Sequence, residues 1–105
     1  MILSVIIPCF NEKKTITRII NKILAINKIK KQIIIIDDLS TDGTRDIIKN
    51  QIEKKIDKVI YHKKNLGKGA AIKSAIRYVK GDLVIIQDAD LEYEPKDYYK
   101  LVYQF

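Results

Sequence analysis

Cysteine is nearly absent from the sequence. Cys9 is the only one, so a fold held by internal disulfide bonds is excluded, and a lone thiol fits a reducing compartment such as the cytoplasm. Long hydrophobic runs are also missing: runs such as residues 33–36 fall far short of the ~20 residues that a membrane-spanning helix needs. The N-terminus does not resemble a signal peptide, because Lys13 and Lys14 follow its apolar stretch without a small-residue cleavage site. We therefore expect a cytoplasmic chain without a transmembrane segment.

Arginine is scarce, which limits the partners that we expect for a basic chain. The sequence has 20 Lys+Arg against 13 Asp+Glu, a formal net charge of +7, and almost all of the excess is lysine. Aromatic side chains that could stack on bases are not interleaved with the lysine clusters. We therefore expect solvated surface lysines and no nucleic-acid partner, although a positive field favours an anionic substrate.

The length predicts one domain. A chain of 105 residues is long enough for a single core, and it contains no repeat, low-complexity tract or linker. Its 47% hydrophobic and 31% charged residues are typical of a folding chain rather than a disordered one. We expect residues 1–105 to form one domain.

Four short apolar runs predict an α/β fold. The expected strands are residues 3–7, ended by Pro8, and residues 33–36, 58–61 and 83–86. Continuously apolar strands separated by helices indicate an open parallel sheet with helices on both faces. Right-handed crossovers leave few topologies, and the strand order 3-2-1-4 is the expected one.

Four helical patterns alternate with these strands. The expected helices begin near Thr15, with Asn11 as N-cap, then within residues 40–43, after Gly67, and at Pro95. The third is expected to bury Ile72, Ala75, Ile76 and Val79.

Polar residues follow three of the strands. They are Asn11 and Glu12, then Asp37 and Asp38, and finally Asp88 and Asp90. Parallel strands end at a common edge, and open α/β sheets bind ligands there, where strands 1 and 4 diverge. Carboxylates that meet at one mouth repel each other unless a cation or a donor-rich ligand lies among them, and their oxygens suit Mg²⁺ or Mn²⁺. The pattern predicts a metal–diphosphate site. The alternative is that these polar residues cap helices. Capping explains well why Ser40 and Asp42 stand after a strand, but it explains the positions of Asp88 and Asp90 poorly.

A segment with two glycines and a lysine opens the third helix. The backbone N–H groups of residues 65–69 and the Lys68 ammonium can hold an anion. The segment is not a Walker A loop, because His62 and Gly69 stand where glycine and Ser or Thr are needed. Taken alone, it is equally consistent with a tight turn. We expect His62 to lie on the surface and Cys9 to be a small packing residue.

Four segments carry a resemblance to a known family. They are Ser4 to Glu12, Ile36 to Thr44, Asn65 to Gly69, and Gln87 to Glu92. In order and spacing they resemble family 2 glycosyltransferases, and the closest branch is similar to dolichol-phosphate mannosyltransferase and the polyprenyl-phosphate glucosyltransferases.

The resemblance implies the nucleotide-sugar-binding half of a GT-A fold, which is Rossmann-like. It implies that Pro8, Phe10 and Glu12 line the nucleotide pocket, and that Ile36 and Asp38 contact the base or the ribose. Asp88 and Ala89 are then expected to complete the pocket. Asp90 is expected to ligate the metal together with Asp88. Lys68 joins this expected substrate-binding set as the anion-holding lysine.

The implied reaction is sugar transfer from a GDP- or UDP-sugar to an acceptor such as a polyprenyl or dolichyl phosphate. The resemblance implies Mg²⁺ or Mn²⁺ on the diphosphate and peripheral association with the cytoplasmic face of a membrane. Leu39 departs from the family, in which glycine or another small residue is usual. Family catalytic domains run about twice this length. We therefore expect the acceptor-side motifs and the general base beyond Phe105.

Two alternatives belong to other functional classes. A phospho-acceptor receiver domain also combines Mg²⁺, paired aspartates and alternating strands, but its acidic pair follows the first strand, whereas here the pair follows the second. A nucleotide-sugar-binding module without catalysis shares every motif of the leading hypothesis, and only turnover assays separate the two.

Overall fold

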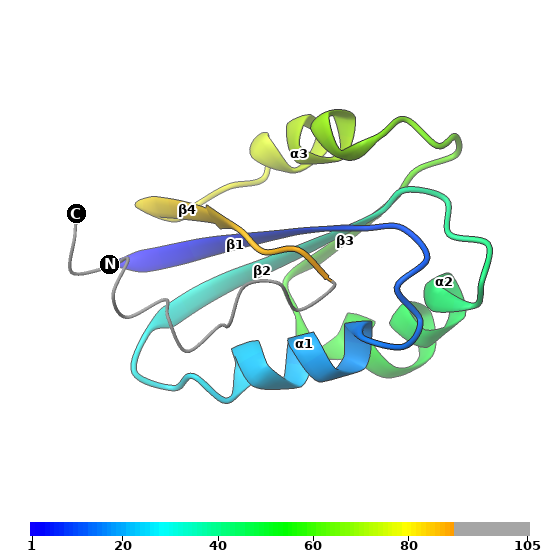
Figure 1. The fold of residues 1–105 in the computed structure, drawn as a ribbon. Helices are drawn as coiled ribbons and strands as arrows, with labels where there is room; N and C mark the ends of the chain where they lie inside the picture. Colours follow the sequence, from blue (N-terminus) through cyan, green and yellow to red (C-terminus); the bar gives the residue numbers. More distant parts are fainter. Residues whose placement is uncertain (90–105) are drawn as a thin grey trace.

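The computed structural model describes residues 1–89 (Figure 1). Its elements are β1 (Ile2–Cys9), α1 (Ile16–Leu24), β2 (Lys30–Asp37), α2 (Thr44–Ile47) with its continuations η1 (Ile48–Ile52) and η2 (Glu53–Lys55), β3 (Lys58–Tyr61), α3 (Lys68–Ile76) and β4 (Leu83–Ile86). The helix predicted at Pro95 and the predicted metal ligand Asp90 lie outside the described residues. Within residues 1–89, no helix is both long and apolar enough to cross a membrane.

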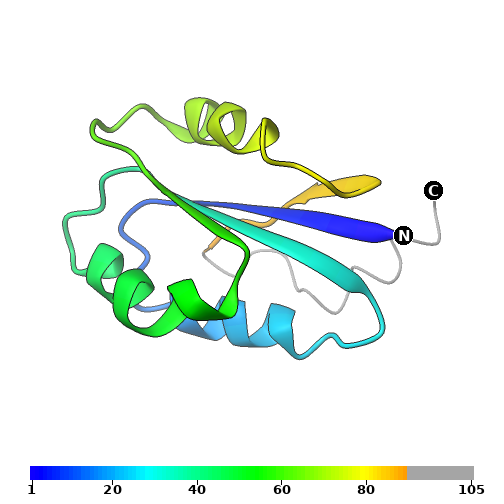
Figure 2. The same ribbon diagram turned by 180° about the vertical axis from the view of Figure 1, so that it is seen from behind.

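The four strands form one parallel sheet in the order β3-β2-β1-β4, which confirms the predicted topology. β1 lies between β2 and β4, so that Val5 pairs with Ile33 on one side and with Ile85 on the other. Figures 1 and 2 show α1 and α2 on one face of the sheet and α3 on the other. The sheet is therefore covered on both faces, which explains why its central strands are continuously apolar.

Alternation along the strands divides the core into two layers. The larger layer lies between the sheet and α1 with η1, and its fully buried members include Val5, Ile7, Ile16, Ile19, Ile20, Ile23, Ile35 and Ile48. The smaller layer packs Ile6, Ile34 and Ile36 against Ala71 and Ala75 of α3. Each fully buried isoleucine contributes about 1.5–3 kcal/mol relative to an exposed one, so the larger layer dominates the stability of the fold.

The buried face predicted for α3 is partly wrong. Ala71 and Ala75 are fully buried, whereas the Ile76 side chain is 58% exposed. Residues four apart lie on the same side of a helix, and the two alanines are the pair that faces the sheet. Ile76 is rotated by about 100° from Ala75 on the helix, so it points away from the core.

The end of β1 also differs from the prediction. The strand does not stop at Pro8 but continues to Cys9, because Pro8 pairs with β2 at Ile36. The Ile6 carbonyl accepts a hydrogen bond from the Gln87 N–H, so the backbone groups of Ile6 point towards β4. The backbone nitrogen of Pro8, two residues further along the strand, points towards the same side. The pairing of β1 with β4 ends at Ile86, so no hydrogen bond between these strands is lost because Pro8 has no N–H.

Asn11 is not an N-cap. α1 begins at Ile16, after Thr15. Asn11 has φ +53°, and its side-chain oxygen accepts a hydrogen bond from the Thr41 N–H at 2.7 Å. Asparagine tolerates this left-handed conformation better than most residues, so Asn11 turns the chain after β1 instead of starting the helix.

A buried serine fixes the turn before β4. The Ser4 hydroxyl donates to Gln32 Oε1 at 2.7 Å and accepts from the Gly81 N–H at 2.9 Å. A Cβ atom on Gly81 would lie 2.5 Å from Ser4 Oγ and 2.7 Å from the Ile2 carbonyl oxygen. Only glycine therefore fits at position 81 without displacing backbone.

Candidate functional site

The carboxyl edge of the sheet carries an open cavity of about 360 Å³. It lies where β1 and β4 diverge, because β1 runs on to Cys9 after its pairing with β4 has ended at Ile6. The described residues that line it are Pro8, Cys9, Phe10, Glu12, Asp38, Lys68, Ala71, Asp88 and Ala89. The cavity thus occupies the topological switch point at which open α/β sheets bind ligands.

Most of the site residues predicted from the sequence meet in this cavity. Seven line it: Pro8, Phe10, Glu12, Asp38, Lys68, Asp88 and Ala89. Ile36 is not brought there, because its side chain is fully buried in the core between the sheet and α3. Asp90 lies outside the described residues. The individual roles of these residues stay predictions.

Asp38 closes one wall of the cavity by binding backbone. Its Oδ1 accepts from the Leu66 N–H at 2.9 Å, and its Oδ2 accepts from the Gly67 N–H at 2.8 Å. Burial alone would raise the pKa of this carboxyl, but the hydrogen bonds from Leu66, His62 and Gly67 outweigh burial and lower the pKa. Asp38 is therefore a carboxylate that holds the entry to α3 against the end of β2.

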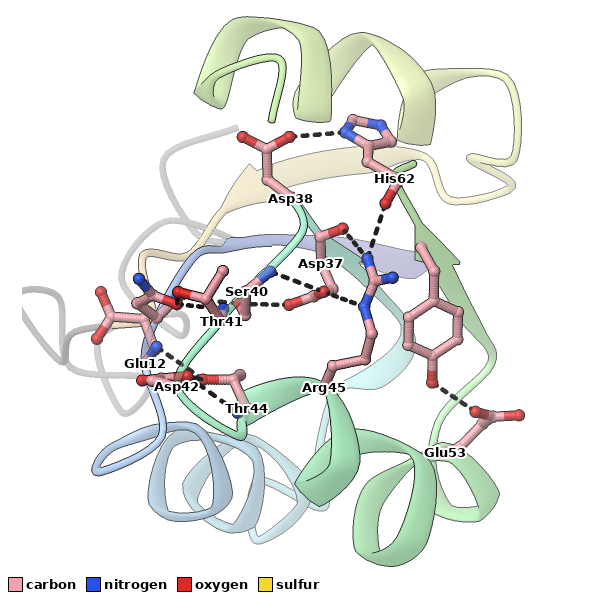
Figure 3. A network of polar contacts seen from close by, with 12 residues as sticks. Glu12, Asp37, Asp38, Ser40, Thr41, Asp42, Thr44, Arg45, Glu53 and His62 are labelled. Carbon is pink, nitrogen blue, oxygen red and sulfur yellow. Dashed lines mark hydrogen bonds and ion pairs between the residues drawn. The ribbon is translucent and has the colours of Figure 1, made fainter. Parts of the chain in front are cut away.

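His62 is buried, and its predicted surface position is wrong. The residue is 8% exposed, and its Nδ1 lies 2.9 Å from Asp38 Oδ1 (Figure 3). Its Nε2 lies 2.8 Å from Ser74 Oγ. The contact follows from the register of two neighbouring strands. Asp37 and Tyr61 are paired in the sheet, so the next residues, Asp38 and His62, leave neighbouring strands side by side.

Asp37 belongs to a different network from Asp38. Its side chain is completely buried and accepts from Arg45 Nε at 2.7 Å and from the Ser40 hydroxyl at 2.6 Å (Figure 3). Arg45 also donates to the His62 carbonyl oxygen at 2.8 Å and lies over the Tyr61 ring. Successive strand residues point to opposite faces, so the crowd of carboxylates expected from the sequence does not form at Asp37 and Asp38.

Side chains after β2 support the loop after β1. The N–H groups of Asn11, Glu12 and Lys13 donate in turn to Ser40 Oγ, Thr44 Oγ1 and Asp42 Oδ2, at 2.9, 3.0 and 3.3 Å. Ser40 and Asp42, for which helix capping was the alternative, are therefore bound to a neighbouring loop, and of the two only Asp42 also accepts an N–H bond at the start of α2, from Thr44. These bonds fix the segment that brings Phe10 and Glu12 to the cavity.

Thr15 is a site-supporting residue that the sequence did not reveal. Its hydroxyl donates to the Ala89 carbonyl oxygen at 2.6 Å, across 74 positions of the chain. This bond holds the segment after β4 against the start of α1. No local motif marks such a contact, because it depends on how the sheet brings β1 and β4 together.

Two charged residues face each other at the mouth. Lys68 Nζ lies 2.5 Å from Asp88 Oδ1, and both side chains are partly exposed to solvent. Within residues 1–89, no group of three His, Cys, Asp or Glu side chains is placed to hold a metal ion. A Mg²⁺-type ion needs only one or two protein carboxylates when a phosphate and water molecules supply its other ligands. Asp88 could therefore serve as a ligand for a cation at the mouth of the cavity.

Cys9 lines the cavity as a packing residue. It is 2% exposed, and burial, together with the negative charges of Asp37 and Glu12, raises the pKa of its thiol far above the usual range. A thiol that stays protonated is not a nucleophile. The packing role predicted from the sequence agrees with this burial.

Leu39 adopts a backbone conformation that favours glycine. Its φ is +62°, in the left-handed region. Glycine adopts this conformation without a Cβ penalty, which gives a physical reason for a glycine at this position in the family that the sequence resembles. The turn keeps the left-handed geometry although leucine occupies it.

Comparison with known sequences identifies proteins that are similar over nearly the whole chain. The family model described as Glycosyl transferase family 2 matches residues 4–105. The undecaprenyl-phosphate 4-deoxy-4-formamido-L-arabinose transferase of Edwardsiella ictaluri is 33% identical over 104 residues, which cover 94% of this chain and 32% of that protein. The transferase of the same description from Aeromonas hydrophila is 33% identical over 106 residues, with 96% and 32% covered. The chain therefore spans about a third of the length of these curated relatives.

Solved structures share the fold. The mannosyltransferase PcManGT from Pyrobaculum calidifontis, in complex with GDP-Man and Mn²⁺, is 28% identical with a TM-score of 0.76, covering 84% of this chain and 27% of that one. S. aureus TarS in complex with UDP-GlcNAc is 30% identical with a TM-score of 0.79, covering 99% and 30%. Glucosyl-3-phosphoglycerate synthase from Mycobacterium tuberculosis, in complex with Mn²⁺, UDP and glucosyl-3-phosphoglycerate, is 28% identical with a TM-score of 0.75, covering 95% and 38%. The parallel sheet of order 3-2-1-4 matches the Rossmann-like part of these GT-A glycosyltransferases.

Proposed function

This chain belongs to glycosyl transferase family 2, and from that membership we propose that its cavity binds the nucleoside-diphosphate sugar of a glycosyl transfer reaction. The observation that carries the proposal is the convergence of seven predicted residues, from four separate segments, on one cavity at the carboxyl edge of the sheet. Pro8 and the exposed ring of Phe10 offer an apolar surface for a base, and Lys68 offers a positive charge for a diphosphate.

Lys68 and Asp88, at the mouth of the cavity, would have different roles in binding the diphosphate. Lys68 stands at the first position of α3, where the helix dipole and the ammonium both favour an anion. Asp88 repels an anion unless a cation lies between them, so it suits a metal ligand. The proposed division is that Lys68 attracts phosphate oxygens directly and Asp88 acts with a divalent cation.

A divalent cation, Mg²⁺ or Mn²⁺, is part of the proposal. Asp88 and Asp90 would hold it, and Mn²⁺ is present in the structures of two similar glycosyltransferases. When bound, such a cation offsets the charge that develops on a departing nucleoside diphosphate. The protein's own contribution is to hold the donor so that its anomeric carbon faces the acceptor.

The proposed acceptor is a polyprenyl or dolichyl phosphate. This proposal is supported by curated relatives described as undecaprenyl-phosphate transferases. The donor base stays open between guanine and uracil, because similar structures contain GDP-Man in one case and UDP-GlcNAc in another. A lipid-linked acceptor would require peripheral contact with a membrane, at the cytoplasmic face if the single cysteine reflects a reducing compartment.

Calorimetric titration of the purified chain with UDP, GDP and their sugar conjugates, with and without Mn²⁺, tests the proposal. We expect metal-strengthened binding, and we expect Lys68→Ala to weaken it by roughly 1–3 kcal/mol, the scale of a lost charge-assisted contact. Asp88→Asn and Asp90→Asn should remove the part of the affinity that depends on metal.

Matched controls lie outside the cavity. Lys73 shares α3 with Lys68, and Asp46 is an exposed carboxylate on α2, and neither lines the cavity. Lys73→Ala and Asp46→Asn should bind nucleotide like the parent chain. Absence of binding by any of these nucleotides to demonstrably folded protein, or equal losses in the control variants, would contradict the proposed function.

A further inference from the structure

A buried histidine lies directly behind the cavity wall. The His62 ring is held at one nitrogen by Asp38 on the β2 side (Figure 3) and at the other by Ser74 on α3. His62 is not among the described residues that line the cavity, so any effect on a ligand must pass through another residue.

Asp38 is the residue that connects His62 to the cavity. Its carboxylate lines the cavity and accepts three hydrogen bonds, one from His62 and two from the backbone of Leu66 and Gly67. An ionised carboxylate only accepts hydrogen bonds, so His62 carries a proton on Nδ1. The Leu66–Gly67 segment leads directly into Lys68, which also lines the cavity. His62 therefore restrains the carboxylate that sets the distance between β2 and the start of α3.

The order Asp38, His62, Ser74 matches that of a nucleophilic triad, but the surroundings of the serine differ. Ser74 lies within α3, and its hydroxyl is 3.0 Å from the Ala70 carbonyl oxygen, one turn earlier. Ser74 does not line the cavity, so a substrate bound there would not meet its hydroxyl. Ser74 is an anchor for the far side of the ring.

We propose that His62 is a positioning residue of the nucleotide site, which acts by holding the Asp38 carboxylate and, through it, the Leu66–Gly67 segment and Lys68. The inference rests on the proposed function of the cavity and adds to it a residue that does not contact the ligand. Its central element is the Nδ1 contact to Asp38, and the Nε2 contact to Ser74 is secondary.

Two conservative variants separate the ring contacts. In His62→Asn, the side-chain amide can occupy the position of Nδ1 and keep the bond to Asp38. In His62→Gln, the amide reaches the position of Nε2 and keeps only the bond to Ser74. Ser74→Ala is the matched control, because it removes the Ser74 contact and leaves the ring on Asp38.

The first readout needs no ligand. Amide hydrogen exchange at Leu66 and Gly67, measured by NMR, should become about tenfold faster in His62→Gln, the size expected when a charge-assisted hydrogen bond is lost. In His62→Asn and Ser74→Ala the exchange should stay within about twofold of the parent chain, as expected where no such bond is lost. Equal acceleration in both His62 variants, in step with their melting temperatures, would show a merely structural role and overturn the proposal.

The second readout is the affinity for UDP and GDP. His62→Gln should bind about tenfold more weakly, whereas His62→Asn should bind like the parent, because only the first loses the restraint on Asp38. Unchanged affinity in His62→Gln overturns the proposal. If the parent chain binds neither nucleotide, the proposed function fails, and the exchange experiment alone decides the role of His62.

A measurement on the unaltered chain tests the proposal even if the His62 variants do not fold. Saturation with the nucleotide that binds should shift the NMR signals of the His62 ring, although the ring does not touch the ligand. An unchanged His62 spectrum, with clear shifts elsewhere around the cavity, would show that the residue is not coupled to the site and would contradict the proposal.

Discussion

Replacing Asp38 by alanine should destabilise the fold before any ligand is considered. The carboxylate satisfies three donors, the N–H groups of Leu66 and Gly67 and the His62 ring. Each buried donor left without an acceptor costs about 1–3 kcal/mol. The open cavity lets water reach part of this wall, so we expect a total loss of about 3–5 kcal/mol, a large share of the roughly 5–15 kcal/mol by which such domains are stable.

Urea unfolding followed by circular dichroism measures this loss. Asp38→Asn keeps one acceptor oxygen and should lose about half as much as Asp38→Ala. A loss below about 1 kcal/mol in Asp38→Ala would refute the view that this carboxylate holds the entry to α3. The matched comparison is Asp46→Asn, which removes an exposed carboxylate and should leave the unfolding free energy within about 0.5 kcal/mol.

The same carboxylate predicts a pH dependence with a definite sign. The pKa of Asp38 is lower in the folded chain than in the unfolded one. Its contribution is therefore fully present above the unfolded pKa of about 3.9 and is lost as pH falls through the lowered folded value. The difference in unfolding free energy between the parent chain and Asp38→Asn should shrink below about pH 4, and a difference that stays constant down to pH 2 would contradict this reasoning.

Three further predictions concern the backbone and the reaction. At position 39, where φ is +62°, Leu39→Gly should be more stable than Leu39→Ala by about 1 kcal/mol in urea unfolding, the reverse of the usual order, and a more stable alanine variant would be inconsistent with this left-handed turn. Gly81→Ala should lower the free energy of unfolding by roughly 1–3 kcal/mol, because its Cβ meets backbone and Ser4, whereas Gly69→Ala has open space and should raise it by about 0.5–1 kcal/mol. Residues 1–105 alone should not catalyse multiple turnovers from labelled UDP-glucose or GDP-mannose to a polyprenyl phosphate with Mn²⁺, because we expect the acceptor-side motifs and the general base to lie outside these residues; turnovers abolished by Asp90→Asn would disprove this.

Local patterns predicted most of the fold. The strands at residues 58–61 and 83–86 have the predicted bounds, because short apolar runs between polar turns leave little ambiguity. The strand order followed from chain connectivity and handedness rather than from any single residue. The exposed position of Ile76 was missed because helical spacing alone does not say which of two adjacent apolar stripes faces the sheet, and the smaller alanines pack there.

The candidate site was predictable in its location but not in its contacts. Residues that end parallel strands meet at one edge, which is why Glu12, Asp38 and Asp88 could be placed around one cavity. The partners of His62 and Thr15 depend on the register between strands and on the distance of a helix from the sheet. No local sequence motif indicates this register or this distance. The separation of Asp37 from Asp38 follows from strand alternation, and it agrees with a predicted substrate site that includes Asp38 and not Asp37.

The central claim is that nucleoside diphosphate binds at the carboxyl edge of the sheet. A second hollow of about 380 Å³ lies at the opposite edge, where Lys30, Lys58 and Lys80 would also attract an anion. Mapping the backbone amide shifts that UDP or GDP causes in the presence of Mg²⁺ distinguishes the two edges in one experiment. We predict the largest shifts at Phe10, Gly67, Lys68 and Ala89, and shifts confined to the lysines of the opposite edge, or none at saturating nucleotide, would contradict the account.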